Sequence, residues 1–193
     1  LRSFSRVTPK KTLDVTRSND WNEIPDYIID ELQKKEHFFI QEFKKGEYYI
    51  VKNESEEVIC FAKITKVDWR IERLPGNLGR FLTKIIPFIP GINRVIRPKK
   101  HSFIIPEGVY IKGNCPKLLN EFYSSILAEE KRNLILWWVD PKEELYSATN
   151  NKMKWGILNK LIGVTQVNII SKTIDGENKY SKQSFHISGT DMG

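Results

Sequence analysis

The sequence contains few of the residues that build metal and disulfide sites. It has 2 cysteines and 3 histidines among 193 residues. Cys60 and Cys115 lie far apart, and neither belongs to a CxxC or Cys–His spacing of the kind that zinc sites use. We therefore expect no metal site and no disulfide framework. So low a cysteine content is typical of the reducing cytoplasm.

Long apolar runs and targeting segments are missing as well. No stretch approaches the roughly 20 apolar residues that a transmembrane helix needs. The first 20 residues are polar and basic, so we expect no secretory signal peptide. No internal repeat or low-complexity tract is visible in the sequence. We therefore expect a protein without an integral membrane segment, located in the cytoplasm.

What is present is an ordinary globular composition with a moderate positive charge. Apolar residues make up 40% of the chain and aromatic residues 11%, too many for a disordered protein. The 31 lysines and arginines exceed the 24 acidic residues by 7. This excess fits an anionic partner, and it equally fits a lysine-rich soluble surface. The length favours one domain over residues 1–193.

The first half of the chain predicts a strand, a helix and a hairpin. Residues 11–17 alternate weakly and predict a first strand. Apolar residues at helical spacing predict a helix that ends near Lys35, with Asn22 as its N-cap and Pro25 in its first turn. Residues 46–53 and 57–69 are rich in β-branched and aromatic residues and flank a polar turn, which predicts a hairpin. The second of these strands begins apolar on both faces, so we expect it to be central.

The second half predicts alternating strands and helices. Residues 102–112 predict a strand that is interrupted at 106–108, and 134–139 predict a short buried strand. Between them, residues 118–131 predict a helix, with Asn114 as N-cap and Pro116 in its first turn. Residues 141–162 predict another helix that pauses at 149–151 and ends at Gly163. Two final strands are expected at 164–171 and 179–188.

Residues 74–100 break this pattern and are interpreted as an insertion over one end of the sheet. Four prolines and three glycines bound a short apolar stretch, and the segment ends in arginines and lysines. The apolar side chains can pack on the domain with the basic ones solvated. They can also line an acceptor pocket or touch a membrane surface. We do not expect a nucleic-acid patch at Lys99 and Lys100, since aromatic and basic residues do not interleave there as in known nucleic-acid-binding modules.

The element order and one local run resemble the GNAT family of acyl-CoA-dependent N-acetyltransferases. The order is strand, helix, two long strands, strand, helix, strand, helix and two strands, and the run is GVYIKGNCPKLLNEFYSSILAEEKRNLILWWVD. The resemblance covers roughly residues 12–187. It implies an α/β (α+β) fold, with a GNAT-like mixed and mostly antiparallel central sheet and helices on both faces.

The resemblance also implies a site for acetyl-CoA as co-substrate. Residues 109–112 would be the strand that binds the cofactor, and residues 112–117 the turn that holds its pyrophosphate. Residues 134–139 would form the next strand, which splays away. A helix N-terminus offers free N–H groups to such an anion. The cofactor-binding residues implied in this way are Val109, Tyr110, Ile111, Lys112, Gly113, Asn114, Lys117 and Leu118.

Two residues correspond to the catalytic groups that the family carries. Tyr146 would protonate the departing thiolate, and Glu107, at the kink before the cofactor strand, would deprotonate the amine. Each also has a plain structural interpretation, as a half-buried packing tyrosine and as part of an ordinary turn. The turn departs from the family pattern Gln/Arg-x-x-Gly-x-Gly/Ala, because it reads Lys-Gly-Asn-Cys-Pro-Lys with one glycine.

The expected function is therefore transfer of an acyl group from acetyl-CoA, or another acyl-CoA, to a primary amine of an acceptor. The alternative is a GNAT-like module without catalysis, which would contact an anionic partner through the basic insertion. The degenerate turn motivates this alternative. The sequence does not identify the acceptor, the acyl chain or the oligomeric state.

Overall fold

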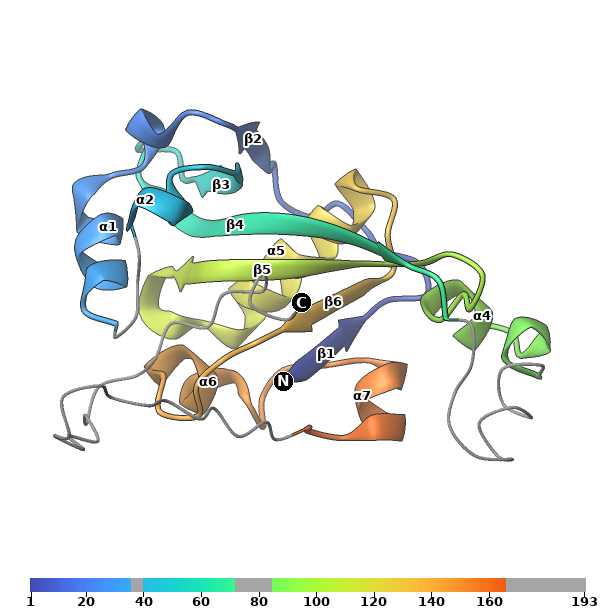
Figure 1. Ribbon diagram of the computed structural model, residues 1–193. Helices are drawn as coiled ribbons and strands as arrows, with labels where there is room; N and C mark the ends of the chain where they lie inside the picture. Colours follow the sequence, from blue (N-terminus) through green and yellow to red (C-terminus); the bar gives the residue numbers. More distant parts are fainter. Residues whose placement is uncertain (36–39, 72–84, 166–193) are drawn as a thin grey trace, which may run out of the picture.

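A mixed six-stranded sheet forms the centre of the protein (Figure 1). The computed structural model describes residues 1–35, 40–71 and 85–165. Across the sheet the strands are ordered β1 (Arg2–Ser5), β6 (Leu134–Trp137), β5 (His101–Ile111), β4 (Val58–Trp69), β3 (Glu47–Lys52) and β2 (Thr16–Ser18). β5 and β6 run parallel, and every other neighbouring pair is antiparallel. The predicted α+β class with a mostly antiparallel sheet is confirmed.

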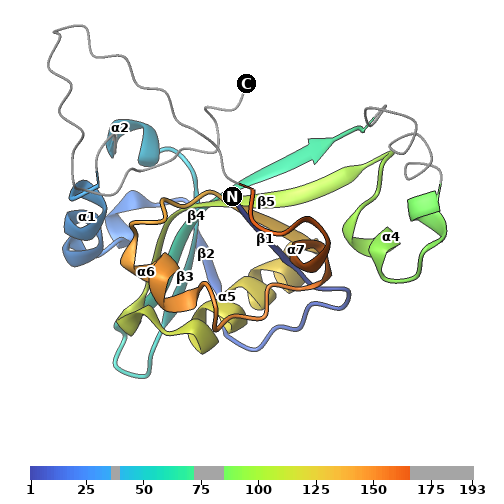
Figure 2. The same ribbon diagram turned by 90° about the horizontal axis from the view of Figure 1, so that it is seen from below.

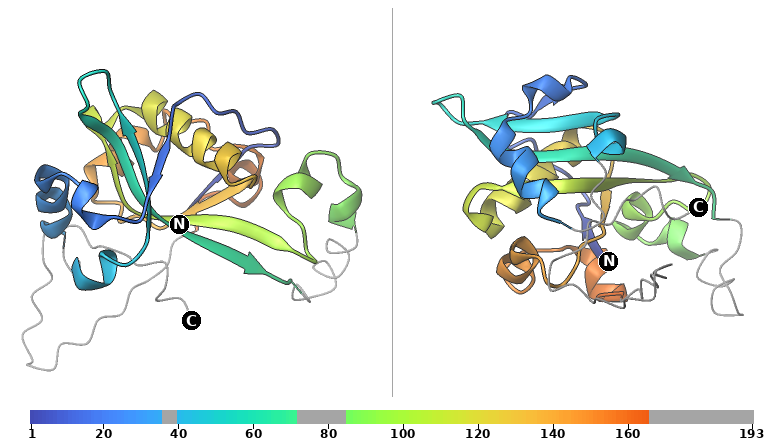
Figure 3. Two further views of the ribbon diagram at one scale, coloured as in Figure 1. Left: turned by 90° about the horizontal axis from the view of Figure 1, so that it is seen from above. Right: turned by 60° about the vertical axis from the view of Figure 1, so that its left-hand side comes forward.

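Helices cover both faces of this sheet (Figure 3). On one face lies the long helix α5 (Pro116–Glu129), whose Leu119, Phe122 and Ile126 pack against alternate residues of β3 and β4. On the other face lie α1 (Asp26–Gln33) and α2 (Ile40–Phe43), packed on the intervening residues of the same strands. This division follows from the alternation of side chains along a strand. It explains why the first half of β4 is apolar on both faces.

The β3–β4 hairpin and the helix α5 lie where the sequence predicts them. The hairpin strands pair from Glu47 opposite Ile64 to Lys52 opposite Val58. The helix α5 ends in a hydrogen-bonded cap, in which the Arg132 amide donates to the Leu127 carbonyl over 2.9 Å. Its C′ residue, Lys131, takes the left-handed conformation at φ 52° that usually favours glycine.

The N-terminal region differs from the prediction. The predicted strand at 11–17 is reduced to β2 at residues 16–18, and β1, at residues 2–5, is not predicted at all. Asn22 is not a helix N-cap. It lies in a 3-10 turn, η1 (Trp21–Glu23), which Asp20 caps, and α1 begins only after Pro25. Proline ahead of the helix holds an extended backbone, and this separates the two turns.

The predicted helix at 141–162 is two short helices, α6 (Glu144–Thr149) and α7 (Ile157–Ile162). The break falls at the expected pause, and α7 ends at Gly163 as predicted. Gly156 starts α7 with φ 99° and ψ −174°, a conformation reserved for glycine. The two predicted final strands lie outside the described residues, apart from positions 164 and 165 of the first strand.

The described part of the insertion, residues 85–100, forms the turn η2 (Ile86–Phe88) and the short helix α4 (Ile92–Val95). They lie at the end of the sheet where β4 finishes and β5 starts (Figure 2). Val95 packs on Phe103 and Ile105 of β5, so the predicted contact with one end of the sheet is present. Phe88 does not pack on the domain, because 83% of its surface is exposed.

The first residue of β5 predicts a dependence of stability on pH. His101 is buried beside the Phe103 ring, and burial lowers the pKa of its imidazole from the ordinary 6.5. The unfolded chain therefore binds this proton at a higher pH than the folded protein does. The free energy of unfolding should fall as the pH drops from about 7 to about 5, above the range in which carboxylates titrate.

Denaturant melts across this pH range test the role of His101. The variant His101→Gln, which has no titratable side chain, should show a flatter dependence whatever its absolute stability. Equal slopes for the variant and the native protein would contradict the assignment.

Candidate functional site

The parallel strands β5 and β6 diverge toward their carboxyl ends. They pair through Ile104 and Ile135 alone. Beyond this point β5 continues to pair with β4 as far as Ile111, while β6 pairs with β1 up to Trp137. Within the described sheet, the edge of β5 that faces β6 therefore has no ladder partner after Ile104. Backbone N–H and C=O groups along an unpaired strand edge can hydrogen-bond to an extended ligand.

A β-bulge lies in this unpaired half of β5. Lys63 of β4 faces Glu107, and Phe61 faces Tyr110, so Ala62 faces both Gly108 and Val109. Gly108 has a φ of 58°, as expected for a bulge that begins with glycine. The strand is therefore continuous from 101 to 111, and the predicted interruption at 106–108 is this bulge.

Glu107 is buried at the bulge, on the face covered by α1 and α2. Only 3% of the residue is exposed, and its Oε2 lies 3.4 Å from Lys63 Nζ. Lys63 Nζ in turn lies 5.2 Å from the centre of the Phe43 ring of α2. The predicted base is thus a buried carboxylate with a cationic neighbour.

A second, half-buried ion pair lies between the end of α1 and the start of α6, and no sequence motif indicates it. Lys35, just after α1, lies 2.8 Å from Glu143, the residue before α6. Burial raises the pKa of the Glu143 carboxyl, and the Lys35 charge opposes this shift. The pair joins α1 to the end of β6 across 108 residues of sequence. No spacing rule relates residues so far apart, so only the fold shows the pair.

The turn after β5 is the 3-10 segment η3 (Lys112–Asn114). Asn114 is not the N-cap of α5, because its φ of 49° places it in the left-handed region one residue too early. Cys115 occupies the cap position without a side-chain hydrogen bond, and no acidic residue lies in the first turn of α5. The helix therefore begins with uncapped N–H groups, although Pro116 removes one of them.

The basic residues of this turn are exposed. Lys112 Nζ lies 2.6 Å from Glu57 Oε2, and this bond raises the pKa of the lysine. Lys117 extends along α5 at 3.9 Å from Glu121. Both lysines can reach an anion at the helix N-terminus, provided that Lys112 exchanges its carboxylate partner for that anion.

The other predicted cofactor residues contribute mainly backbone. Val109 and Ile111 bury their side chains against α5, and Leu118 packs on the edge of the same core. Tyr110 points to the opposite face, where its ring lies 5.9 Å from that of Tyr27. The side chains of residues 109–111 thus lie on the two faces of the sheet. Their backbone N–H and C=O groups lie in its plane, along the edge of β5 that faces β6.

Tyr146 is not brought together with Glu107 by any contact of the described residues. Its hydroxyl lies 3.5 Å from Nη2 of Arg2, on the β1 side of β6. The Arg2 guanidinium lies between the rings of Tyr146 and Trp155, at 5.6 and 5.2 Å from their centres. The helix that carries Tyr146 does pack against η3.

Comparison with known proteins identifies no relative: no protein-family model, no curated protein and no solved structure matches this chain. In the described part of the chain, no helix has the length and apolar character to cross a membrane. Among the same residues, no group of three or more histidine, cysteine and acidic side chains could hold a metal ion.

Proposed function

We propose that the protein is an acyl-CoA-dependent N-acyltransferase that binds its acyl donor along the unpaired edge of β5. The observation that carries this proposal is the divergence of β5 and β6 after one residue pair, with a bulge in the unpaired half. This is the arrangement expected from the resemblance to the GNAT family. The function it implies rests on that resemblance, because one fold supports many functions.

The turn and the strand edge would share the binding of the donor. The uncapped start of α5, together with Lys112 and Lys117, would hold the pyrophosphate of acetyl-CoA. Backbone groups of Val109 to Ile111 would hydrogen-bond to the extended pantetheine arm. The same N–H groups would polarise the thioester carbonyl as negative charge develops on its oxygen.

Transfer would follow direct attack of an amine on the thioester. Glu107 would take one proton of the substrate ammonium, and the neutral amine nitrogen would then bond to the acyl carbon. As the tetrahedral intermediate collapses, the carbon–sulfur bond would break and the nitrogen would lose its second proton to solvent. Tyr146 would protonate the CoA thiolate that leaves. The acceptor would approach from the side of α1 and α2, since Glu107 faces these helices.

A pair of variants at the turn tests the cofactor site. Lys112→Glu should weaken acetyl-CoA binding about tenfold or more, because it replaces an attractive charge by a repulsive one. Glu57→Gln frees Lys112 from its carboxylate partner and should leave the affinity unchanged or tighter. Calorimetry on both variants, with thermal melts to verify folding, separates the charge of Lys112 from the ion pair. Equal weakening in both would argue against a role for Lys112.

A binding module without catalysis is the second candidate. The ion pairs of Lys112 with Glu57 and of Glu107 with Lys63, together with the single-glycine turn, favour it. A protein of this kind would bind acetyl-CoA without turning it over, or would not bind it. A screen of amine acceptors that follows CoA release distinguishes the two candidates once binding is measured.

A further inference from the structure

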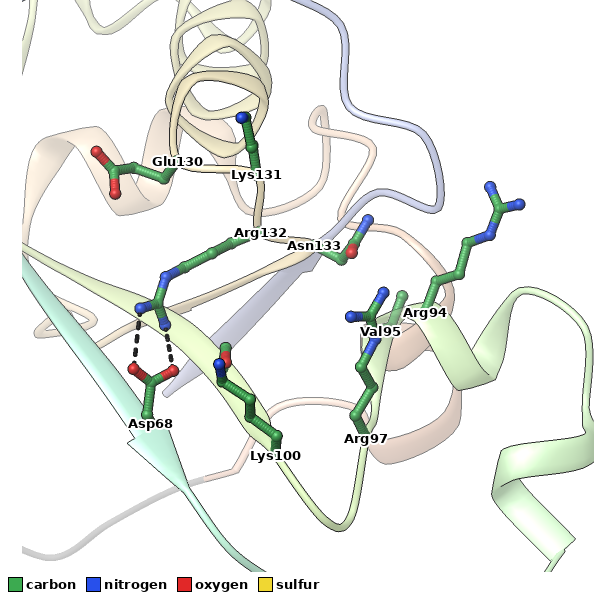
Figure 4. Close-up of a pocket in the computed structure, with 10 residues that line it drawn as sticks. Asp68, Arg94, Val95, Arg97, Lys100, Glu130, Lys131, Arg132 and Asn133 are labelled. Carbon is green, nitrogen blue, oxygen red and sulfur yellow. Dashed lines mark hydrogen bonds and ion pairs between the residues drawn. The ribbon is translucent and has the colours of Figure 1, made fainter.

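A hollow of about 260 Å³ lies at the opposite end of β5 from the turn described above (Figure 4). Three separate segments form its walls: the end of β4 at Asp68, residues 94–102 between α4 and β5, and residues 130–133 between α5 and β6. A water molecule occupies roughly 30 Å³, so the hollow accommodates a group much larger than a single ion.

Positive charge dominates the walls of this hollow. Five cationic residues line it, against the two acidic residues Asp68 and Glu130. The five are Arg94, Arg97, Lys100, Lys131 and Arg132.

Both acidic residues are already engaged with cations. Asp68 pairs with Arg132 through two bonds of 3.1 and 3.3 Å, and Glu130 lies 2.9 Å from Lys66. In the described part of the chain, the four other cations have no carboxylate within 4 Å. The negative end of α5 offsets only about half of one charge. A large positive excess therefore remains in the hollow.

The wall behind these charges is held firmly. The Arg132 side chain is 13% exposed and donates hydrogen bonds to the carbonyls of Val67 and Phe103, at 2.8 and 3.1 Å. The Asn133 amide donates to the carbonyl of Arg6 over 2.8 Å. Arg97 and Lys100 extend from the opposite rim of the hollow toward residues 130–133 (Figure 4). Arg97, Lys100 and Arg132 therefore face the same space, and the hydrogen bonds of Arg132 and Asn133 hold one of its walls.

We propose that the hollow is a binding site for a phosphate-bearing ligand with at least two negative charges. Guanidinium groups donate paired N–H bonds to phosphate oxygens, and lysines add point charge. Two arginines and two lysines without carboxylate partners match such a group better than a singly charged carboxylate. The phosphate can belong to a free small molecule or to a lipid headgroup, since both present the same oxygens.

This site goes beyond the proposed acyltransferase function. The hollow lies at the first residues of β5 and the CoA turn follows its last, so about 35 Å of strand separates them. The acetyl-CoA pyrophosphate at the turn cannot reach Arg97 or Lys100. Either site can therefore exist without the other.

Inorganic pyrophosphate is the probe for a titration of the full chain by calorimetry. The native protein should bind it, and the double variant Arg97→Glu/Lys100→Glu should bind it at least about tenfold more weakly. Lys99→Glu is the control, because Lys99 is an exposed neighbour that does not line the hollow. It should change the affinity by less than about twofold. Lys112→Glu should leave intact the binding event that the double variant loses, because any pyrophosphate held at the CoA turn is a second and separate event. Thermal melts verify that each variant is folded.

A second arm uses phosphatidylcholine vesicles with and without phosphatidylinositol phosphate. Binding to the phosphoinositide vesicles alone, lost in the double variant and kept in Lys99→Glu, would support the site and assign the phosphate to a lipid. If the protein bound neither inorganic pyrophosphate nor the phosphoinositide vesicles, the proposal would be overturned. A loss of affinity in Lys99→Glu as large as that in the double variant would also overturn it, because it would indicate general attraction to anions. None of these results depends on acetyl-CoA binding at the turn.

Discussion

Gly156→Ala should destabilise the protein by about 4 kcal/mol and lower its melting temperature by about 8–16 °C. A methyl group on Gly156 would lie 2.1 Å from the backbone oxygen of Ser5. Backbone atoms cannot move aside as a flexible side chain can. The φ of 99° and ψ of −174° add strain, since residues other than glycine rarely adopt this conformation.

The clash would also disrupt the hydrogen-bonded contact between β1 and the start of α7. The Ser5 amide donates to the Trp155 carbonyl over 2.8 Å, and Ser5 Oγ accepts from the Leu158 amide over 3.2 Å. Displacement of residues 155–158 would lose both bonds and withdraw Leu158 from the core.

Gly163→Ala is the matched control for this prediction. Gly163 has a φ of 75° and ψ of −149°, in the same region of backbone conformation, but a methyl group there would meet no atom of the described residues within 4 Å. It should therefore cost only the backbone strain, about 1–3 kcal/mol. Thermal and denaturant melts of the two variants give the comparison. A loss in Gly156→Ala no larger than that in Gly163→Ala would contradict the tight contact with Ser5.

Gly108→Ala should cost about 3 kcal/mol and disturb the bulge beside Glu107. The added methyl group would lie 2.5 Å from Cζ of Phe43 and 3.1 Å from Cδ2 of Leu32. Phe43 is buried between the rings of Tyr48 and Phe61, so it has little space to withdraw. Movement of Phe43 would also shift the environment of Lys63, whose ammonium lies over its ring.

Gly113→Ala is the matched control, because it measures the cost of a positive φ in alanine without a steric clash like that of Gly108 with Phe43. Gly113 has a φ of 65°, close to that of Gly108, and in the part of the chain that the structure describes no atom lies within 4 Å of a methyl group placed there. Its cost should be about 1 kcal/mol, the ordinary penalty for a left-handed alanine. Melts of both variants, followed by near-ultraviolet circular dichroism of the aromatic cluster, give the comparison. Similar stability losses and unchanged aromatic spectra in the two variants would contradict the packing of Gly108 on Phe43.

The sequence predicts the elements whose patterns are strong and local. The β3–β4 hairpin, helix α5 and strand β6 lie at the expected residues because apolar periodicity and turn chemistry agree there. The α+β class follows from the order of these elements. The divergence of β5 from β6 cannot be derived from periodicity, because it depends on β1 binding the far edge of β6.

The errors have a common physical origin in short segments and distant contacts. Strand β1 has four residues and gains its stability from pairing with a strand 130 positions later, so its own pattern is weak. Asn114 is of a residue type that often caps helices, but it takes a left-handed conformation, and Cys115 occupies the N-cap position instead. The pair of Lys35 and Glu143 joins two element ends that no local spacing relates.

Titration of the native protein with acetyl-CoA by calorimetry is the most direct test of the proposed acyltransferase. Desulfo-CoA and ATP are the reference ligands, and the Arg97→Glu/Lys100→Glu variant excludes binding through the basic hollow. We predict that the protein binds acetyl-CoA with micromolar affinity and does not bind ATP. The affinity for acetyl-CoA should be weakened by Lys112→Glu and unchanged in Arg97→Glu/Lys100→Glu. Absence of acetyl-CoA binding up to millimolar concentration, with the protein folded, would contradict it.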